Sequence, residues 1–290
     1  MTGRGGWIGL LYLTPALLFV GAFVLYPLGQ LVYLSLTSSS LLGGSEFIGL
    51  RNYIRAFTDQ TFWHSLQFTI KYTVYITPIL MGLGYLLALL TAGTGAIARF
   101  TRAVVFLPVV IGLGSSSLLW FWLFDQQVGL FNKLLQDLHI VSQPVVWFVD
   151  ADVGLWAVII SVVWKVVGFG MILFVAAIQS VSPEINEAAL IDGAGYWQRV
   201  RKVTLPLTYR TILLTTLISA IGSMLAFDQF YIMTSGGPKS ETFTSVYWMY
   251  QNSFIYFKLG YGATLSIILM AIVFIAAAVQ IALTRRGAVR

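Results

Sequence analysis

Long stretches without a charged residue are the feature of this sequence that most restricts its fold. Charged residues are absent from 5–45, 72–98, 103–124, 211–227 and 259–284, and 153–183 contains only Lys165. A helix rises about 1.5 Å per residue, so about 20 apolar residues cross the roughly 30 Å hydrocarbon core of a bilayer. The sequence therefore predicts six transmembrane helices, at approximately 9–36, 67–92, 103–124, 154–180, 208–233 and 260–284.

Composition also indicates an all-α membrane protein. Only 10% of the 290 residues are charged, whereas soluble domains carry about 25%. The apolar stretches are too long for the roughly 10-residue strands of a membrane β-barrel. No internal repeat is visible, so we expect a single transmembrane domain, 1–290, built as a six-helix bundle. The first stretch is too long for a signal peptide, and we expect it to be retained.

The distribution of lysine and arginine predicts the orientation of the bundle. If the N-terminus is cytoplasmic, ten basic residues fall on the cytoplasmic side and six on the outer side. An excess of basic residues in cytoplasmic loops is typical of membrane proteins. We therefore expect both termini and the segment 181–207 to be cytoplasmic. The net charge of +6 follows from this topology, and it gives no reason to expect nucleic acid as a partner.

The segment 181–207 is longer and more polar than a turn between two transmembrane helices needs to be. Ser182 suits the position before a helix, and Pro183 suits its first turn. Gly193 and Gly195 interrupt the pattern and predict a bend before a second short helix. The segment is therefore predicted to be a helix–turn–helix that lies on the cytoplasmic face and contacts another protein.

An alternative is that this segment is an amphipathic helix resting on anionic lipid headgroups. Such a helix gains from cations, whereas Glu187 is an anion in the first predicted helix. The acid and the two glycines favour a protein partner over a lipid surface.

The same segment resembles the signature loop of permease subunits in bacterial binding-protein-dependent ABC importers. That signature is Glu-Ala-Ala, three residues, Gly, nine residues, then Ile-x-Leu-Pro. The matching residues here are Glu187, Ala188, Ala189, Gly193, Val203, Leu205 and Pro206, with Asp192 directly before the glycine. Valine in place of isoleucine is the one departure, and it keeps a β-branched apolar group.

Other segments resemble the carbohydrate-importing branch of this family, which includes maltose, multiple-sugar and glycerol-phosphate permeases. They are Tyr26-Pro27, Ser35-Leu36, 49–53, Trp164-Lys165 with Phe169, 178–181, 227–230 and 234–238. The resemblance therefore extends over most of the chain.

The resemblance implies a type I importer permease in the bacterial inner membrane that is not itself an enzyme. Two partner ATPase subunits would bind ATP and Mg²⁺, since this chain lacks a phosphate-binding Gly-x-x-x-x-Gly-Lys-Ser/Thr loop. A second permease subunit, usually a different chain, would complete the path, and a soluble binding protein would deliver a sugar or sugar derivative from outside. The loop carrying Glu187 would seat in a cleft of the ATPase and transmit its closure to the membrane helices.

Two charged residues lie within predicted membrane helices and have two interpretations each. Burying Lys165 near mid-bilayer costs at least about 2.5–3.5 kcal/mol, so it either lines the translocation path or pairs with a carboxylate or with helix carbonyls. Asp228 either binds sugar hydroxyls near the outer boundary or caps a chain break. Trp164, Phe169 and Gln229 are the other candidates for the substrate path.

Other classes of function find little support. The chain has no cysteine, which excludes disulfides and thiolate chemistry. His64 and His139 lack metal-ligand spacing, and Ser115–Ser117 lack a nearby base, so we expect no metal site and no catalytic residue. A secondary transporter, which would show repeats and ion-site carboxylates at mid-depth, is the alternative, together with an ABC permease for a non-sugar solute such as glycerol phosphate.

Overall fold

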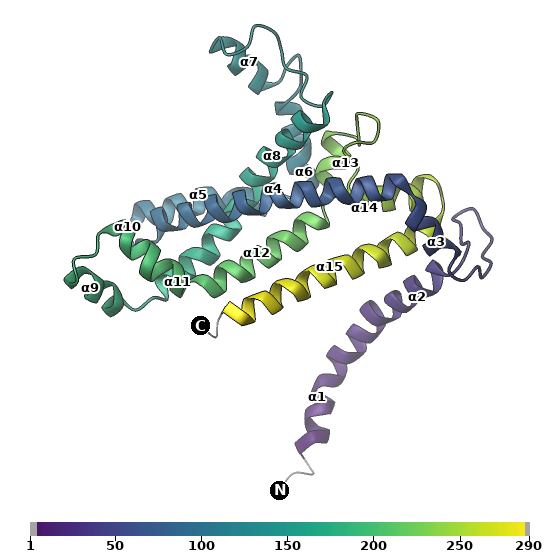
Figure 1. The fold of residues 1–290 in the computed structure, drawn as a ribbon, viewed down its shortest axis with the longest axis horizontal. Helices are drawn as coiled ribbons and strands as arrows, with labels where there is room; N and C mark the ends of the chain where they lie inside the picture. Colours follow the sequence, from purple (N-terminus) through teal and green to yellow (C-terminus); the bar gives the residue numbers. More distant parts are fainter. Residues whose placement is uncertain (1–4, 288–290) are drawn as a thin grey trace. The chain divides into compact units, whose positions relative to one another are not determined.

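The computed structural model describes residues 5–287, which are almost entirely helical (Figure 1). Within this range, the β-structure is one isolated antiparallel bridge between Thr37 and Phe47. The chain forms two compact units. One combines the residues up to Phe62 with Trp248–Ile272, and the other combines Trp63–Tyr247 with the residues from Val273 onward. The single domain expected from the sequence stays a prediction.

The first unit begins with one long apolar helix that contains a π-helical turn. Its elements are α1 (Gly5–Val20), η1 (Gly21–Leu25), α2 (Tyr26–Ser35), α3 (Arg51–Thr58), η3 (Gln251–Ile255) and the start of α15 (Leu259–Gly287). Residues Tyr12–Ser35 are long and apolar enough to cross a membrane, and none of their most apolar window is buried within the chain.

A polar network ties the loop after α2 to α3 and α15. The buried Asn52 side chain donates hydrogen bonds to the carbonyls of Ser35 (3.1 Å) and Thr37 (2.8 Å). Thr264 of α15 donates to the Ser35 carbonyl at 3.0 Å. Gly260 allows this approach, because a Cβ atom there would lie 2.1 Å from the Thr37 carbonyl oxygen. The first residues of α15 are thereby held against the loop.

The second unit contains α8, whose apolar window is 50% buried, the largest share among the four described helical segments that are long and apolar enough to cross a membrane. Its elements are α4 (Gln60–Thr91), which starts in the first unit, α5 (Ala96–Val110), α6 (Leu113–Leu123), α7 (Leu130–Asp137), α8 (Ala151–Gln179), α9 (Pro183–Ile191), α10 (Tyr196–Arg199), η2 (Val200–Thr204), α11 (Leu205–Leu207), α12 (Tyr209–Met224), α13 (Asp228–Met233) and α14 (Ser245–Tyr250), which ends in the first unit. Helix α8 packs against α5, α6, α12 and α13.

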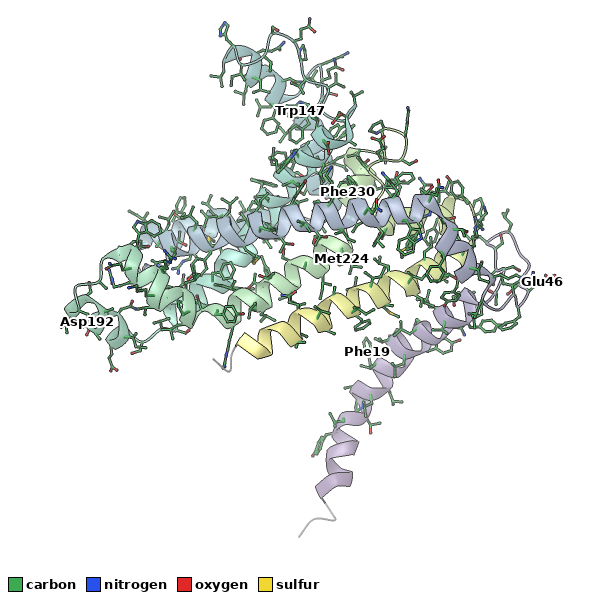
Figure 2. The ribbon with its side chains drawn as sticks, in the orientation of Figure 1. Phe19, Glu46, Trp147, Asp192, Met224 and Phe230 are labelled. Carbon is green, nitrogen blue, oxygen red and sulfur yellow. The ribbon has the colours of Figure 1, made fainter. Side chains whose placement is uncertain are left out.

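Aromatic side chains fill the contact between α4 and α13 in the second unit. Phe230 is fully buried, and its ring meets those of Phe68 and Tyr72 edge-on at 5.2 Å and 5.0 Å between centroids (Figure 2). Edge-to-face pairs of this kind add about 0.5–1.5 kcal/mol beyond the area that they bury. The short helix α13 is fixed in this way despite having only six residues.

Bends divide two of the six transmembrane helices expected from the sequence. Four described helical segments are long and apolar enough to cross a membrane, or six if each of two bent helix pairs counts as one span. The expected span 103–124 is broken between α5 and α6 with a 98° bend. Pro108 in the last turn of α5, which lacks an N–H, and Gly112 before α6 account for this break.

The expected fifth span, 208–233, also differs from the observed helices. Helix α12 ends at Met224, and a break of three residues separates it from α13. At its other end, α12 meets Tyr196–Leu207 at 69°. The apolar length of 208–233 is therefore shared between one 16-residue helix and one short helix.

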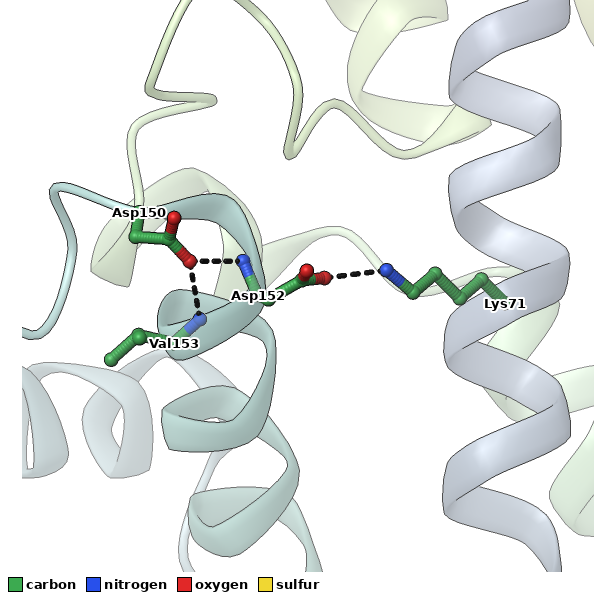
Figure 3. Close-up of polar contacts among 4 residues, drawn as sticks. All are labelled: Lys71, Asp150, Asp152 and Val153. Atoms are coloured by element: carbon green, nitrogen blue, oxygen red, sulfur yellow. Dashed lines mark hydrogen bonds and ion pairs between the residues drawn. The ribbon is translucent and has the colours of Figure 1, made fainter.

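The N-terminus of α8 is fixed by two carboxylates (Figure 3). Asp150 accepts hydrogen bonds from the backbone N–H groups of Asp152 (2.9 Å) and Val153 (3.0 Å), which caps the helix. Asp152 forms an ion pair with Lys71 of α4. These contacts set the start of α8 relative to α4 within the second unit.

Candidate functional site

The segment 181–207, here called the coupling segment, folds as the helix–turn–helix that the sequence predicts. Ser182 precedes α9, although its side chain makes no capping hydrogen bond, and Pro183 occupies the first turn. The turn after α9 places Gly193 at φ +78°, in the left-handed region that favours glycine. The N–H of Ala194 closes this turn by donating to the carbonyl of Ala189 at 2.9 Å. The predicted glycine bend is confirmed.

The second half of the coupling segment is less regular than the sequence indicates. Gly195 stands before α10, and its N–H donates to the Gln198 side chain at 3.0 Å. The second predicted helix is α-helical only from Tyr196 to Arg199 and then continues as the π-helix η2. Single π-helical turns are rare and frequently lie at functional positions. The chain then bends at Thr208 into α12.

Most of the residues that match the signature are exposed on this segment. Glu187, Ala188, Asp192, Gly193, Leu205 and Pro206 are exposed, and Ala189 and Val203 are half-buried. Asp192 lies at the turn between α9 and α10 (Figure 2). Ile191 and Trp197 are 87% and 69% exposed. Large apolar side chains beside charged ones form a surface of the composition that protein interfaces use.

A hollow of about 450 Å³ lies between the coupling segment and the ends of α4 and α8; we call it the segment hollow. Glu187, Tyr196 and Arg199 line it from the coupling segment, and Leu89 lines it from α4. The Nε atom of Arg199 is buried and has no hydrogen-bond partner within the described chain. An acid and a base therefore face one concave surface beside the exposed residues of α9.

A second hollow lies among the helices of the bundle; we call it the bundle cavity. Its volume is about 230 Å³, and its walls come from α4, α6, α8, α12 and α13. Two residues expected on the substrate path, Phe169 and Gln229, line it, and Gln229 donates to the Tyr72 hydroxyl at 3.5 Å. The remaining polar lining consists of hydroxyl groups, from Thr215, Ser219 and Ser223. No charged side chain is among the described lining residues.

Lys165, Asp228 and Trp164 are not among the residues that line the bundle cavity. Lys165 is buried, and its ammonium group donates to the carbonyls of Val109 (3.3 Å) and Pro108 (3.5 Å). These carbonyls belong to the end of α5, where the break before α6 removes the next turn of helix. Of the two interpretations of Lys165, this geometry matches the pairing with helix carbonyls.

Of the other two candidates for the path, one begins a helix and the other packs against an aromatic ring. Asp228 is the first residue of α13 and is half-buried. The Trp164 ring meets Trp120 of α6 edge-on, with 5.6 Å between centroids. Trp120 also stacks on Phe131 at 5.4 Å. These aromatic residues are thus packed against one another within the second unit.

A family model described as binding-protein-dependent transport system inner membrane component matches residues 80–288. The chain belongs to this family. As a member, it is an inner-membrane permease component of a transport system that depends on a binding protein, and the family is not one of enzymes.

Two relatives that match this permease over nearly their whole length are sugar or glycoside permeases by name. The sulfoquinovosyl glycerol transport system permease protein SmoG of Agrobacterium fabrum is 31% identical, over 96% of this chain and 90% of the relative. The lactose transport system permease protein LacF of Rhizobium radiobacter is 32% identical, over 92% of this chain and 90% of the relative.

A solved structure confirms the type I permease fold. A bacterial alginate ABC transporter, crystallised with a periplasmic protein that holds an alginate pentasaccharide, contains a chain that superposes with a TM-score of 0.85. It covers 97% of this permease and 94% of that chain at 20% identity. Because the identity is low, this likeness concerns the fold alone.

Several residues that line the two hollows, or that lie between them, carry no recognisable signal in the sequence. Arg199 of the segment hollow appears in the sequence only as one of several cations, and Ser219 of the bundle cavity as one of many hydroxyl residues in apolar helices. Tyr85 of α4 and Thr208 are hydrogen-bonded across 123 residues of sequence. No local spacing signals such a pair, because it depends on how α4 packs beside the coupling segment.

Proposed function

We propose that this permease forms one half of the translocation path of an ATP-driven importer for a sugar or glycoside. The observation that carries the proposal is the exposed coupling segment, which has the signature of the family and no catalytic group of its own. The relatives named above, together with a trehalose/maltose permease of Thermococcus litoralis that is 30% identical, support a carbohydrate as the substrate.

Two ATPase subunits are the partners proposed for the coupling segment, and they would bind ATP and Mg²⁺. Glu187, Ala188 and the turn at Asp192–Gly193 would enter a cleft of the ATPase, while Val203, Leu205 and Pro206 would connect that contact to α12. The exposed side chains of Ile191 and Trp197 support this assignment, because burying one large apolar side chain contributes about 1.5–3 kcal/mol. Both chain termini would be cytoplasmic, as the distribution of basic residues predicts.

Within the membrane, the proposed partners are lipid and a second permease subunit, which would be a different polypeptide chain. The exposed apolar residues of the span Tyr12–Ser35 support a large membrane-facing contact. A soluble binding protein would dock on the outer face, as the family description implies.

The bundle cavity is proposed to hold the sugar during passage. Phe169 supplies an apolar face and Gln229 an amide that can bind hydroxyl groups, which is the combination that sugar recognition needs. Trp164 and Asp228 are proposed to act near its outer end. Lys165 is proposed to satisfy the carbonyls of α5, since its hydrogen bonds go to Pro108 and Val109.

The test compares two acids of the same helix. Glu187→Ala is expected to weaken ATPase association or to abolish uptake while insertion into the membrane stays normal. Glu184→Ala, which removes an exposed acid from the first turn of α9, is the matched control and is expected to keep both. The measurements are co-purification of the ATPase, and ATP hydrolysis with and without the binding protein and its sugar.

Two outcomes would contradict the proposal. Full uptake by Glu187→Ala would contradict the proposed role of the coupling segment in binding the ATPase. Uptake by this chain without any ATPase would favour a secondary transporter instead.

A further inference from the structure

The corner between the coupling segment and α12 is held by a threonine hydroxyl. Thr208 lies at the 69° bend and is 2% exposed. Its hydroxyl lies 2.8 Å from the carbonyl oxygen of Thr204 and 3.0 Å from the hydroxyl of Tyr85. A threonine hydroxyl has one hydrogen to donate. Since that hydrogen goes to the Thr204 carbonyl, the Tyr85 hydroxyl donates to Thr208.

Tyr85 is itself fixed by the contact between α4 and α8. Its ring meets the fully buried Phe174 of α8 edge-on, with 5.4 Å between centroids. The neighbouring Gly84 brings the two helices close, because a Cβ atom there would lie 3.4 Å from the Phe174 ring and 3.5 Å from the backbone nitrogen of Met171. The position of the Tyr85 hydroxyl is therefore set by two tightly packed helices.

This hydrogen bond lies between the segment hollow and the bundle cavity. Along α4, Leu89 lines the segment hollow and Met81 lines the bundle cavity. Each is four residues from Tyr85, which is about 6 Å along the helix axis. Thr215, two turns along α12 from Thr208, also lines the bundle cavity. Along the chain toward α12, a displacement of the coupling segment passes this corner before it reaches the cavity wall.

The π-helix η2 lies before the corner and is separated from it by the three residues of α11. Its hydrogen bonds close one residue later than those of an α-helix, so it interrupts the regular α-helical ladder. A connection that depended on η2 alone would absorb part of any movement of α9.

We propose that Tyr85 is a positioning residue, whose hydrogen bond to Thr208 makes the coupling segment, α12 and the α4–α8 pair move together. This inference rests on the proposed function, because it assumes that nucleotide binding displaces α9. Without the bond, ATP hydrolysis would continue on the ATPase subunits, but less of the movement would reach the bundle cavity.

The absence of cysteine from the sequence allows a direct test in the assembled importer. A single cysteine introduced as Ser219→Cys reports on the bundle cavity. Its rate of modification by a small charged methanethiosulfonate reagent is measured in nanodiscs, with and without ATP and vanadate. In the parent, the nucleotide is expected to change this rate. In Tyr85→Phe, the nucleotide-induced change is expected to be about fivefold smaller, which corresponds to one net hydrogen bond of about 1 kcal/mol.

Three further variants separate a positioning role from loss of folding. Tyr75→Phe removes a hydroxyl from the same helix, where Tyr75 stacks on Trp156 at 5.7 Å, and is expected to behave like the parent. Thr208→Val removes this bond and also the hydrogen bond to the Thr204 carbonyl, so it is expected to reduce the response at least as far as Tyr85→Phe does, and adding Tyr85→Phe to it is expected to give no further loss. Thr208→Ser keeps the hydroxyl and is expected to restore the response.

Each outcome has one meaning. A Tyr85→Phe importer that keeps the full nucleotide response overturns the positioning role and leaves the proposed function intact. If Tyr85→Phe does not assemble, Thr208→Val tests the same bond from the other side, and a full response there overturns the inference. A parent importer whose cysteine shows no response to ATP and vanadate overturns the proposed function itself.

Discussion

Gly168 is a position at which the packing of the bundle leaves little room for a side chain. It lies in α8, and a Cβ atom there would be 2.3 Å from the carbonyl oxygen of Val105 and 2.9 Å from the Cα atom of Phe106 in α5. Non-bonded heavy atoms prefer separations of about 3.5–4.0 Å, so Gly168→Ala requires α5 to move by roughly 1 Å. The obstructing atoms are backbone, which cannot rotate away.

The expected cost follows from two opposing effects. Overpacking of a well-filled contact costs about 1–3 kcal/mol, whereas alanine is favoured over glycine inside a helix by about 0.8–1.0 kcal/mol. Since the obstruction is backbone, we expect the upper part of the first range, and a net loss of about 1–2 kcal/mol. In soluble domains of 150–250 residues, this corresponds to a fall in Tm of about 2–8 °C.

The assay is thermal unfolding of the purified permease in detergent, with Gly82→Ala as the matched control. Gly82 lies in α4 and has no neighbouring atom within 4 Å of an added Cβ. This control is expected to be neutral or slightly stabilised. If Gly168→Ala unfolds at or above the temperature of Gly82→Ala, the argument that α5 and α8 meet at this glycine is refuted.

Three further predictions concern single side chains. Asp150→Ala is expected to lower the free energy of unfolding by about 1 kcal/mol through loss of a helix cap, and Asp150→Ser to keep it; equal thermal unfolding of the two would contradict the capping role. Lys165→Leu leaves two carbonyls of α5 without their donor and is expected to cost about 1–3 kcal/mol, whereas Lys165→Gln keeps a donor; unchanged thermal stability of the leucine variant would favour a path role instead. The hydrogen bonds from the N–H groups of Val128 and Gln127 lower the pKa of the Asp125 carboxyl. The stabilisation by the ionised carboxylate is therefore fully present above the unfolded pKa of 3.8 and is lost as the pH falls through the lower folded pKa. An NMR titration that gave Asp125 an ordinary pKa would contradict this prediction.

The coupling segment was more predictable from the sequence than the substrate path. Its helix–turn–helix depends on local chemistry: Pro183 opens a helix, and Gly193 adopts a left-handed conformation after it. The candidates for the path rest on depth along single helices, for Lys165 and Asp228, and on short motifs that resemble the family, for the other three. Only Phe169 and Gln229 of those five line the bundle cavity, because the lining depends on which faces of five helices meet.

The difference between local patterns and contacts across the bundle also explains why hydropathy predicts the membrane spans but not the breaks within them. Apolar length is visible in the sequence, but the break between α5 and α6 is not visible in hydropathy. At that break the carbonyls of Pro108 and Val109 accept hydrogen bonds from the ammonium group of Lys165, which belongs to α8. From the sequence, Lys165 could either line the translocation path or pair with a carboxylate or helix carbonyls. Only the packing of α8 on α5 distinguishes these interpretations.

The sequence by itself determined the helical class, the apolar stretches and the fold of the coupling segment. These follow from interactions within a few residues, since a helix satisfies its own backbone and a glycine sets its own turn. The tertiary structure alone decided the partners of Lys165, the lining of the bundle cavity and the bond between Tyr85 and Thr208. Those depend on contacts between segments tens to more than a hundred residues apart, which side-chain packing fixes and no local pattern encodes.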